Sequence, residues 1–202
     1  MRLPQPVLTG DVVRLEPLGR EHVDGLRAAA DADRSTFGWT RVPTPATVEE
    51  YVEEKLAQRD AGQIAPYAQV EVATGRVIGH TSYWAPRVRA DGSLFAVEIG
   101  HTWLTPEAQA GAVNSESKLL LLTHCFETLG VARVDLKTDA RNERSRAAIA
   151  AVGGVFEGVL RQSDVSRRPG EDLRDSAVFS LIAPEWPGAA ERLRARVARK
   201  RG

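Results

Sequence analysis

The chain has 202 residues, of which 43% are hydrophobic and 27% charged, and this suits an ordinary globular domain rather than a disordered segment. Lys and Arg together number 27, as do Asp and Glu, so the formal net charge is zero and a general polyanion binder is disfavoured. The single cysteine, Cys125, excludes an internal disulfide and a cysteine-based zinc site. With no apolar run of membrane-spanning length and no signal-peptide pattern, we expect a cytoplasmic protein.

The first half of the chain predicts a strand, two helices and a run of strands. Residues 12–18 alternate between apolar and polar side chains as a strand does, and residues 22–30 can follow as a short helix. Thr44 is a good N-cap and Pro45 suits the first turn of a second helix, whose apolar residues follow at helical spacing. Three strands separated by tight turns come next, at residues 67–73, 76–84 and 94–104.

The second half of the chain alternates helices with strands. A helix at residues 119–129 is opened by Asn114 or Ser115 and closed by Gly130. No Gly-x-Gly-x-x-Gly follows the first strand, which disfavours a doubly wound nucleotide-binding fold. We therefore predict a single α/β (α+β) domain over residues 1–202, with its core at about 12–186. The remaining elements are expected as a strand at 131–138, a helix from Asn142 to Gly153, strands at 155–162 and 173–182, and a charged C-terminal helix at about 184–200.

Three features of the second half have chemical potential. Glu98 lies in an otherwise apolar strand, so its carboxylate either faces solvent or enters a pocket where desolvation raises its pKa toward that of a general base. Residues 105–114 are rich in small side chains and lead into a helix, which suits either a pyrophosphate site or an ordinary loop. Asn142 and Ser145 either cap a helix or point a carboxamide and a hydroxyl into a cleft.

Other kinds of site find little support. The sequence has no phosphate loop, nucleophile elbow or zinc-protease motif, and its four histidines lack metal-ligand spacing, so we expect no metal. Cys125 lies within a helix between leucines and is predicted to pack rather than to act as a nucleophile.

Five stretches, in this order and spacing, carry a resemblance to a known family: Glu98–Gly100 with Trp103, Leu104 and Pro106; residues 109–118; Lys137–Asp139; Asn142–Ser145; and Arg174–Ser176. They resemble the GCN5-related N-acetyltransferase (GNAT) superfamily, in the RimJ/RimL branch that modifies ribosomal-protein N-termini and its many bacterial relatives. The resemblance covers roughly residues 12–186. It implies a single mixed, mostly antiparallel sheet of about seven strands, with two parallel strands splayed at the cofactor site and helices on both faces.

The resemblance also implies acetyl-CoA as co-substrate and a set of residues that hold it. Backbone groups from Trp103 through Leu104 to Thr105 would pair with the pantetheine arm and polarise the thioester, and Asn142 would hydrogen-bond the same arm. The pyrophosphate would be wrapped by the backbone of Gln109, Ala110, Gly111, Ala112, Val113 and Asn114. Glu98 matches the glutamate that deprotonates the amine in many relatives, and Ser145 takes the role of thiolate acid because no tyrosine follows Asn142 closely.

One departure concerns the family's pyrophosphate pattern, Gln/Arg-x-x-Gly-x-Gly/Ala. Ala112 stands where the first glycine would be, and Asn114 stands at the last position. Because the contacts are backbone N–H groups, alanine can serve wherever the local φ is negative.

The acceptor amine is implied only by position. The family would bind it between the loop that contains Phe37 and Trp39 and the last strands, where Arg174 and Asp175 lie. Asp175 could hold an ammonium group, or Arg174 and Asp175 could form a plain surface ion pair. A protein N-terminus, an amino acid and a small-molecule amine all remain open, as do a monomer and a homodimer.

Three alternatives compete with acetyl transfer. The chain could be a catalytically silent acyl-CoA-binding sensor, which the Ala112 departure would favour and the retained Glu98 disfavours. It could use another donor such as succinyl-CoA. The basic tail at residues 192–199 could contact nucleic acid, but its basic residues alternate with apolar ones and predict a solvated amphipathic helix.

Overall fold

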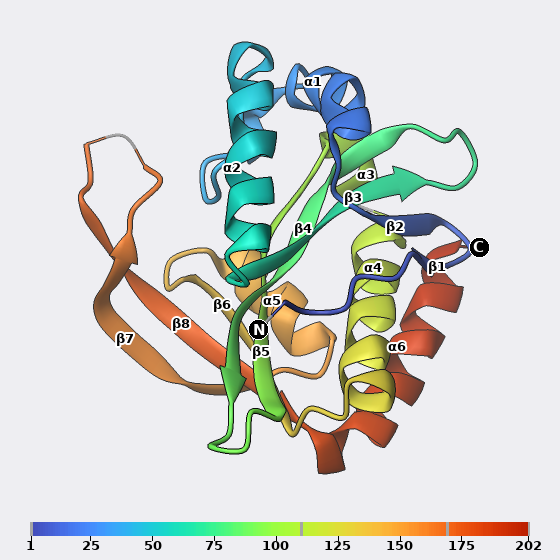
Figure 1. Cartoon of the computed structure of the whole chain (residues 1–202), viewed down its shortest axis with the longest axis vertical. Coiled ribbons are helices and arrows are strands. Elements are labelled where there is room, and N and C mark those ends of the chain that lie inside the picture. Colours follow the sequence, from blue (N-terminus) through green and yellow to red (C-terminus); the bar gives the residue numbers. More distant parts are fainter. Residues whose placement is uncertain (1, 110, 169, 202) are drawn as a thin grey trace.

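The computed structural model describes residues 2–109, 111–168 and 170–201, and its strands form one sheet with helices on both faces (Figure 1). Within these residues the sheet has eight strands in the order β1-β2-β3-β4-β5-β6-β8-β7. All neighbouring strands are antiparallel except β5 and β6. The strands are β1 (Leu8–Thr9), β2 (Val13–Pro17), β3 (Ile64–Glu71), β4 (Val77–Val88), β5 (Leu94–Leu104), β6 (Arg133–Asp139), β7 (Val155–Val165) and β8 (Leu173–Ile182). The mixed, mostly antiparallel sheet predicted from the sequence is confirmed, with the two-residue β1 as an addition.

The helices cover the two faces of the sheet with separate apolar clusters. One cluster joins the sheet to α4, α5 and α6, and the other joins it to α1, α2 and the loop that contains Phe37. The α-helices are α1 (Val23–Ala30), α2 (Val48–Asp60), α3 (Pro106–Gln109), α4 (Val113–Thr123), α5 (Glu143–Ala151) and α6 (Trp186–Arg201). A π-helical turn at His124–Thr128 continues α4. No helix among the described residues is both long and apolar enough to span a bilayer.

The start of α4 differs from the prediction. Its N-cap is Ala112, and neither Asn114 nor Ser115 opens the helix. The hydroxyl of Ser115 instead accepts a hydrogen bond from Arg196 Nε of α6 (3.3 Å), so tertiary packing uses the group that a cap would have used. The predicted end of this helical segment is confirmed, because Gly130 adopts φ +64°.

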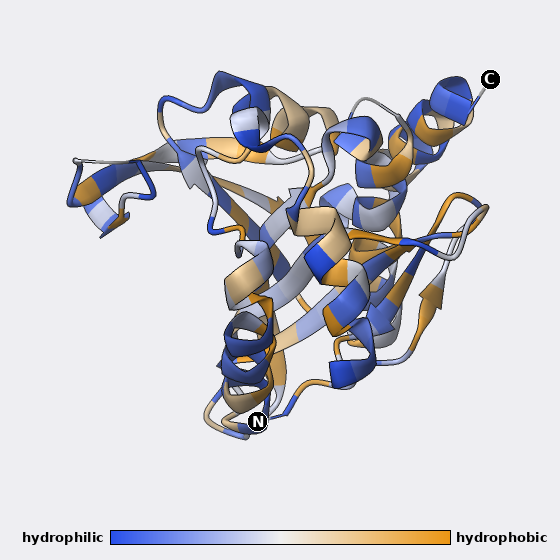
Figure 2. Ribbon diagram, turned by 90° about the horizontal axis from the view of Figure 1, so that it is seen from above, coloured by the Kyte–Doolittle hydropathy of each residue, from blue (hydrophilic) through white to orange (hydrophobic). Residues whose placement is uncertain are grey.

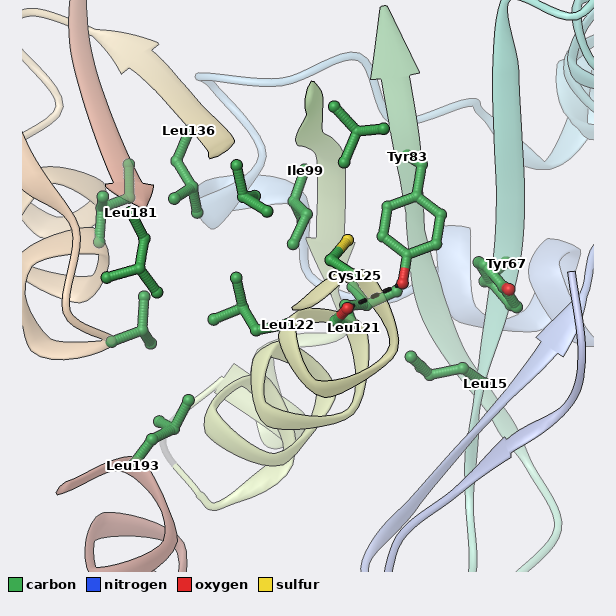
Figure 3. Packing of buried hydrophobic residues seen from close by; sticks show 14 of the residues in the cluster. Leu15, Tyr67, Tyr83, Ile99, Leu121, Leu122, Cys125, Leu136, Leu181 and Leu193 are labelled. Carbon is green, nitrogen blue, oxygen red and sulfur yellow. Dashed lines mark hydrogen bonds between the residues drawn. The ribbon is translucent and has the colours of Figure 1, made fainter. Parts of the chain in front are cut away.

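The main core lies between α4 and the sheet (Figure 3). Tyr83 and Leu121 are fully buried there, and the Tyr83 hydroxyl donates to the Leu121 carbonyl at 2.9 Å. Cys125 is fully buried in the same cluster, and burial raises the pKa of its thiol to about 12. The thiol is therefore protonated at neutral pH, as expected of a packing residue.

The parallel pair β5–β6 separates partway along its length. Strand pairing joins Ala96–Glu98 to Arg133–Asp135, yet β5 runs on to Leu104 and β6 to Asp139. On its other side, β5 has a register shift against β4 around His101, which adopts φ +53°. A bulge of this kind bends its strand and turns it away from a neighbour. The predicted splay of two parallel strands is confirmed.

Gly79 allows β4 to approach β5 closely beside the splay. A Cβ atom at this position would lie 2.1 Å from the carbonyl oxygen of Trp103, which is backbone and cannot rotate away. We expect Gly79→Ala to lower the free energy of unfolding by about 1–3 kcal/mol through overpacking. Urea unfolding tests this, with Gly38→Ala as the control, because a Cβ atom there meets no atom within 4 Å. Equal stability of the two variants would contradict the expectation.

Candidate active site

A cavity of about 1090 Å³ opens where β5 and β6 separate. Its wall includes most of the predicted site residues, which come from both faces of the sheet: Phe37, Trp39, Glu98, Trp103, Leu104, Gln109, Asn114, Asn142, Ser145 and Arg174. Five other predicted site residues that the structure describes do not line it: Thr105, Gly111, Ala112, Val113 and Asp175. Ala110 lies outside the described residues.

Glu98 lies at the point where the two strands part. Its side chain is only 12% exposed, and its Oε2 lies 2.8 Å from the Nζ of Lys137 on β6. Burial raises the pKa of Glu98, the carboxylates of Asp135 and Asp164 raise it further, and Lys137 opposes the change. The result is an ionisable carboxylate inside the cavity with a raised pKa, which is what a general base for an ammonium substrate requires. No pattern in the sequence points to Lys137 as the partner of Glu98.

The end of β5 offers an open backbone edge to the cavity. The N–H of Thr105 donates to the Ile78 carbonyl on β4 (2.8 Å), so Thr105 is engaged with that strand. Because N–H and C=O directions alternate along a strand, the backbone groups of Leu104 point the other way, toward the gap. The Leu104 carbonyl accepts a hydrogen bond from Gln109 Nε2 (2.9 Å). Such an edge can pair with an extended molecule that carries its own amides.

Asn142 and Ser145 combine the two roles that the sequence left open. The Asn142 carboxamide oxygen accepts a hydrogen bond from the Ser145 backbone N–H (3.0 Å), which is the N-cap of α5. Both residues also line the cavity. The cap uses the side-chain oxygen of Asn142 and the main chain of Ser145, which leaves the amide nitrogen and the hydroxyl for a ligand.

A buried lysine that sequence reasoning missed also lines the cavity. Lys118 of α4 is 7% exposed, and its Nζ donates to the hydroxyl of Thr102 at 2.8 Å. Burial lowers the pKa of this lysine to about 7. Its spacing from Leu121 and Leu122 places it on the apolar face of the helix, and that pattern was the signal available in the sequence.

The part of the cavity wall that includes Phe37 and Trp39 is built from aromatic and charged groups. Phe37 packs edge-to-face against Trp103 with ring centroids 6.0 Å apart, which fixes the loop against β5. The guanidinium of Arg168 lies over the Trp39 ring at 4.8 Å. Arg174 pairs with Asp164 of β7 at 2.9 Å, and Asp164 also lines the cavity.

Asp175 has a different place from the one predicted. Its carboxylate accepts a hydrogen bond from the Gln162 backbone N–H (2.8 Å), at a residue with φ +47° in β7. Neighbouring residues of a strand point to opposite faces, so Arg174 faces the cavity and Asp175 faces away. Arg174 therefore pairs with Asp164, and the simple Arg174–Asp175 ion pair considered from the sequence does not form.

The site thus combines two splayed strands, a buried carboxylate where they part and a strand edge beside it. Residues 13–155 match the family model described as the acetyltransferase (GNAT) domain, and the chain belongs to this family. The family predicted from the sequence is confirmed, and an acetyltransferase is the class of enzyme that it contains.

The comparisons with individual proteins agree in fold. A GCN5-related N-acetyltransferase from Brucella melitensis is 28% identical, with a TM-score of 0.84 over 98% of this chain and 87% of that one. Mycobacterium smegmatis RimJ, solved with CoA-disulfide, is 22% identical and shares the fold with a TM-score of 0.76 over 96% of this chain and 92% of that one.

One curated relative is similar over part of its length. The Bacillus subtilis (strain 168) protein named "Putative ribosomal N-acetyltransferase YdaF" is 31% identical over 91 residues. This match covers 45% of the present chain and 48% of the relative, so the chain spans about half the length of that protein.

Proposed function

We propose that the protein transfers an acetyl group from acetyl-CoA to a primary amine, in the bacterial cytoplasm, by direct transfer in a ternary complex. The observation that carries the proposal is Glu98, a buried carboxylate with a raised pKa placed where β5 and β6 separate. The acceptor amine is a protein N-terminus, an amino acid or a small molecule, and the ribosomal name of the partial relative favours a peptide N-terminus.

Each cavity residue then has a task in the reaction. Acetyl-CoA supplies the activated acyl group. The acceptor arrives as ammonium, and Glu98 takes one proton, directly or through a water molecule, which is worth typically 10²- to 10⁴-fold in rate. The Leu104 N–H, which points to the gap, stabilises the charge that develops on the carbonyl oxygen. As the thiolate leaves, the Ser145 hydroxyl in the same wall passes its proton to the sulfur and takes the second proton that the acceptor nitrogen loses, so the hydroxyl is restored.

The acceptor enters on the side of Phe37 and Trp39. Phe37 packs against Trp103, and the guanidinium of Arg168 lies over the Trp39 ring, so this side of the wall is aromatic and its rings already have protein partners. Arg174 and Asp164 place one charge of each sign in the wall close to Glu98 in the fold, because β8 and β7 follow β6 in the sheet. An amine that carries a second polar group, as a peptide N-terminus does, suits such a wall.

A thermal-shift titration tests the donor. We expect acetyl-CoA at 100 times its Kd to add about 2.7 kcal/mol to the free energy of unfolding, with free CoA acting similarly. Succinyl-CoA serves as the second donor, and a larger shift with it would assign a different acyl group. If no acyl-CoA shifts the midpoint at millimolar concentration, the proposal is wrong. If acyl-CoA binds but no peptide or small amine is acetylated, the silent-sensor alternative holds.

A further inference from the structure

The C-terminal helix α6 turns part of its polar face into the cavity. Its apolar residues pack into the core, and Figure 2 shows the helix near the C-terminus striped with hydrophilic and hydrophobic residues. Arg196 and Lys200 are one turn apart and both line the cavity, whereas Arg192 and Arg199 of the same helix do not. The C-terminal segment was predicted to be a solvated amphipathic helix, but two of its cationic side chains line the cavity.

Both cations contact the segment that leads into α4. Arg196 Nε donates to the Ser115 hydroxyl at 3.3 Å, and Lys200 Nζ donates to the Gly111 carbonyl at 3.0 Å. Burial lowers the pKa of Lys200, and the positive charge of Arg196 lowers it further, so the two cations are electrostatically coupled. They hold positive charge beside residues 111–115, the segment expected to receive the pyrophosphate of CoA.

The negatively charged residues of the cavity wall come from other helices and strands than α4, α5 and α6. Among the described residues the wall has three carboxylates, Glu54, Glu98 and Asp164, which come from α2, β5 and β7. The described wall residues from α4, α5 and α6 include no carboxylate, but they include Arg144 and Arg196. Across the residues that the structure describes, neither of these arginines has a carboxylate within ion-pair distance. Their charge is thus available to an anionic ligand.

The backbone of the loop contributes less to the wall than the family pattern implies. Ala112 occupies the position of the first glycine, is 5% exposed and, like Val113, does not line the cavity. Its carbonyl accepts the Glu116 N–H (2.9 Å) as part of the first turn of α4. Its φ of −77° is one that alanine adopts without strain, so the side chains of α6 add positive charge to this segment and do not replace its backbone.

We propose that Arg196, assisted by Lys200, binds the pyrophosphate of CoA from α6, beside the backbone N–H groups at the start of α4. The inference rests on the proposed function, since it assumes that acyl-CoA occupies this cavity. A guanidinium can donate two parallel N–H···O bonds to a phosphate group, and such charge-assisted bonds are among the strong ones in proteins. Ser115 fixes the guanidinium at the segment where the phosphates lie.

The test is calorimetric binding of three probes to the purified full chain: CoA, dephospho-CoA, which keeps the pyrophosphate, and pantetheine, which has no phosphate. We expect Arg196→Ala to raise the Kd of CoA and of dephospho-CoA about tenfold each and to leave that of pantetheine unchanged. Arg196→Lys should recover part of the affinity because it restores the charge without the two-pronged geometry. Arg199→Ala is the matched control on the same helix and should bind all three probes as the wild type does.

Each other outcome counts against the assignment. An equal loss for pantetheine would mean that Arg196→Ala perturbs the cavity and not a phosphate contact. A loss confined to CoA would place Arg196 at the 3′-phosphate and not at the pyrophosphate. Unchanged CoA affinity would remove Arg196 from the site while leaving the proposed function intact. Failure of the wild-type protein to bind CoA would instead overturn the proposed function.

Discussion

Glu98→Gln is expected to lower kcat for amine acetylation by about 10²- to 10⁴-fold, while the affinity for acetyl-CoA stays within twofold. The amide has the same shape as the carboxylate but cannot accept the ammonium proton, so only the chemical step is impaired. Steady-state kinetics at saturating amine, together with calorimetric binding of CoA, separate the two effects. Glu98→Asp keeps the carboxylate on a shorter arm and should retain more activity than Glu98→Gln. Unchanged turnover of Glu98→Gln would remove this residue from the mechanism.

The pH profile follows from the ion pair that Glu98 makes with Lys137. The base must be ionised, so kcat/KM should rise with pH through the pKa of Glu98, and burial places that rise above the ordinary carboxyl range. Lys137 lowers this pKa, so Lys137→Met should move the acid limb of the profile to higher pH. Arg174→Met, which removes a cation from the same wall but not from the ion pair, should leave the limb closer to its wild-type position. If Lys137→Met leaves the acid limb of the kcat/KM profile where it is, a group other than Glu98 controls that limb.

Lys118→Met is expected to stabilise the protein at pH 7 by about 2–4 kcal/mol. Burial lowers the pKa of Lys118 to about 7, and no carboxylate lies within ion-pair distance of it among the described residues. The folded chain therefore carries an uncompensated desolvation cost, and each tenfold change in proton affinity corresponds to 1.36 kcal/mol. Methionine fills a similar volume, and the Thr81 and Thr102 hydroxyls still pair with each other at 2.8 Å.

The same argument sets the sign of the pH dependence. Between about pH 7 and pH 10.5 the unfolded chain holds the Lys118 proton more tightly than the folded chain, so the free energy of unfolding should rise with pH in this window. Below the window the cost is fully present. Urea unfolding of wild type and Lys118→Met should show a difference that shrinks as the pH rises from 7 to 10. Lys55→Met is the comparison: burial also lowers the pKa of Lys55, but Glu54 at 3.2 Å opposes the change, so its difference from wild type should shrink less over this range. A pH-independent difference for Lys118→Met would contradict the assignment.

Much of the architecture could be predicted because it depends on local patterns. The alternation in residues 94–104 and the turn at Gly130 express short-range preferences of the backbone, and both appear in the structure. Thr44 and Pro45 instead open a 3-10 turn at Pro45–Thr47, and α2 begins after it with Thr47 as its N-cap. Glu98 stood out for the same reason, since a carboxylate in an apolar strand is visible without any tertiary information.

Pairings between distant segments could not be predicted in this way. Lys137 is 39 positions from Glu98, and only the parallel register of β5 and β6 brings the two together. The charge of Asp175 made it one candidate for holding the acceptor's ammonium group, but strand alternation turns Arg174 toward the cavity instead. The role of Arg196 needed α6 to fold back over the start of α4, 81 positions earlier.

The sequence by itself thus determined the family, the element order and the ionisable group at the centre of the site. The tertiary structure alone decided which charges surround that group and where Arg196 and Lys118 point. The physical reason is one of range: backbone propensity and hydrophobic period act over a few residues, whereas burial and ion pairing depend on which surfaces meet after folding.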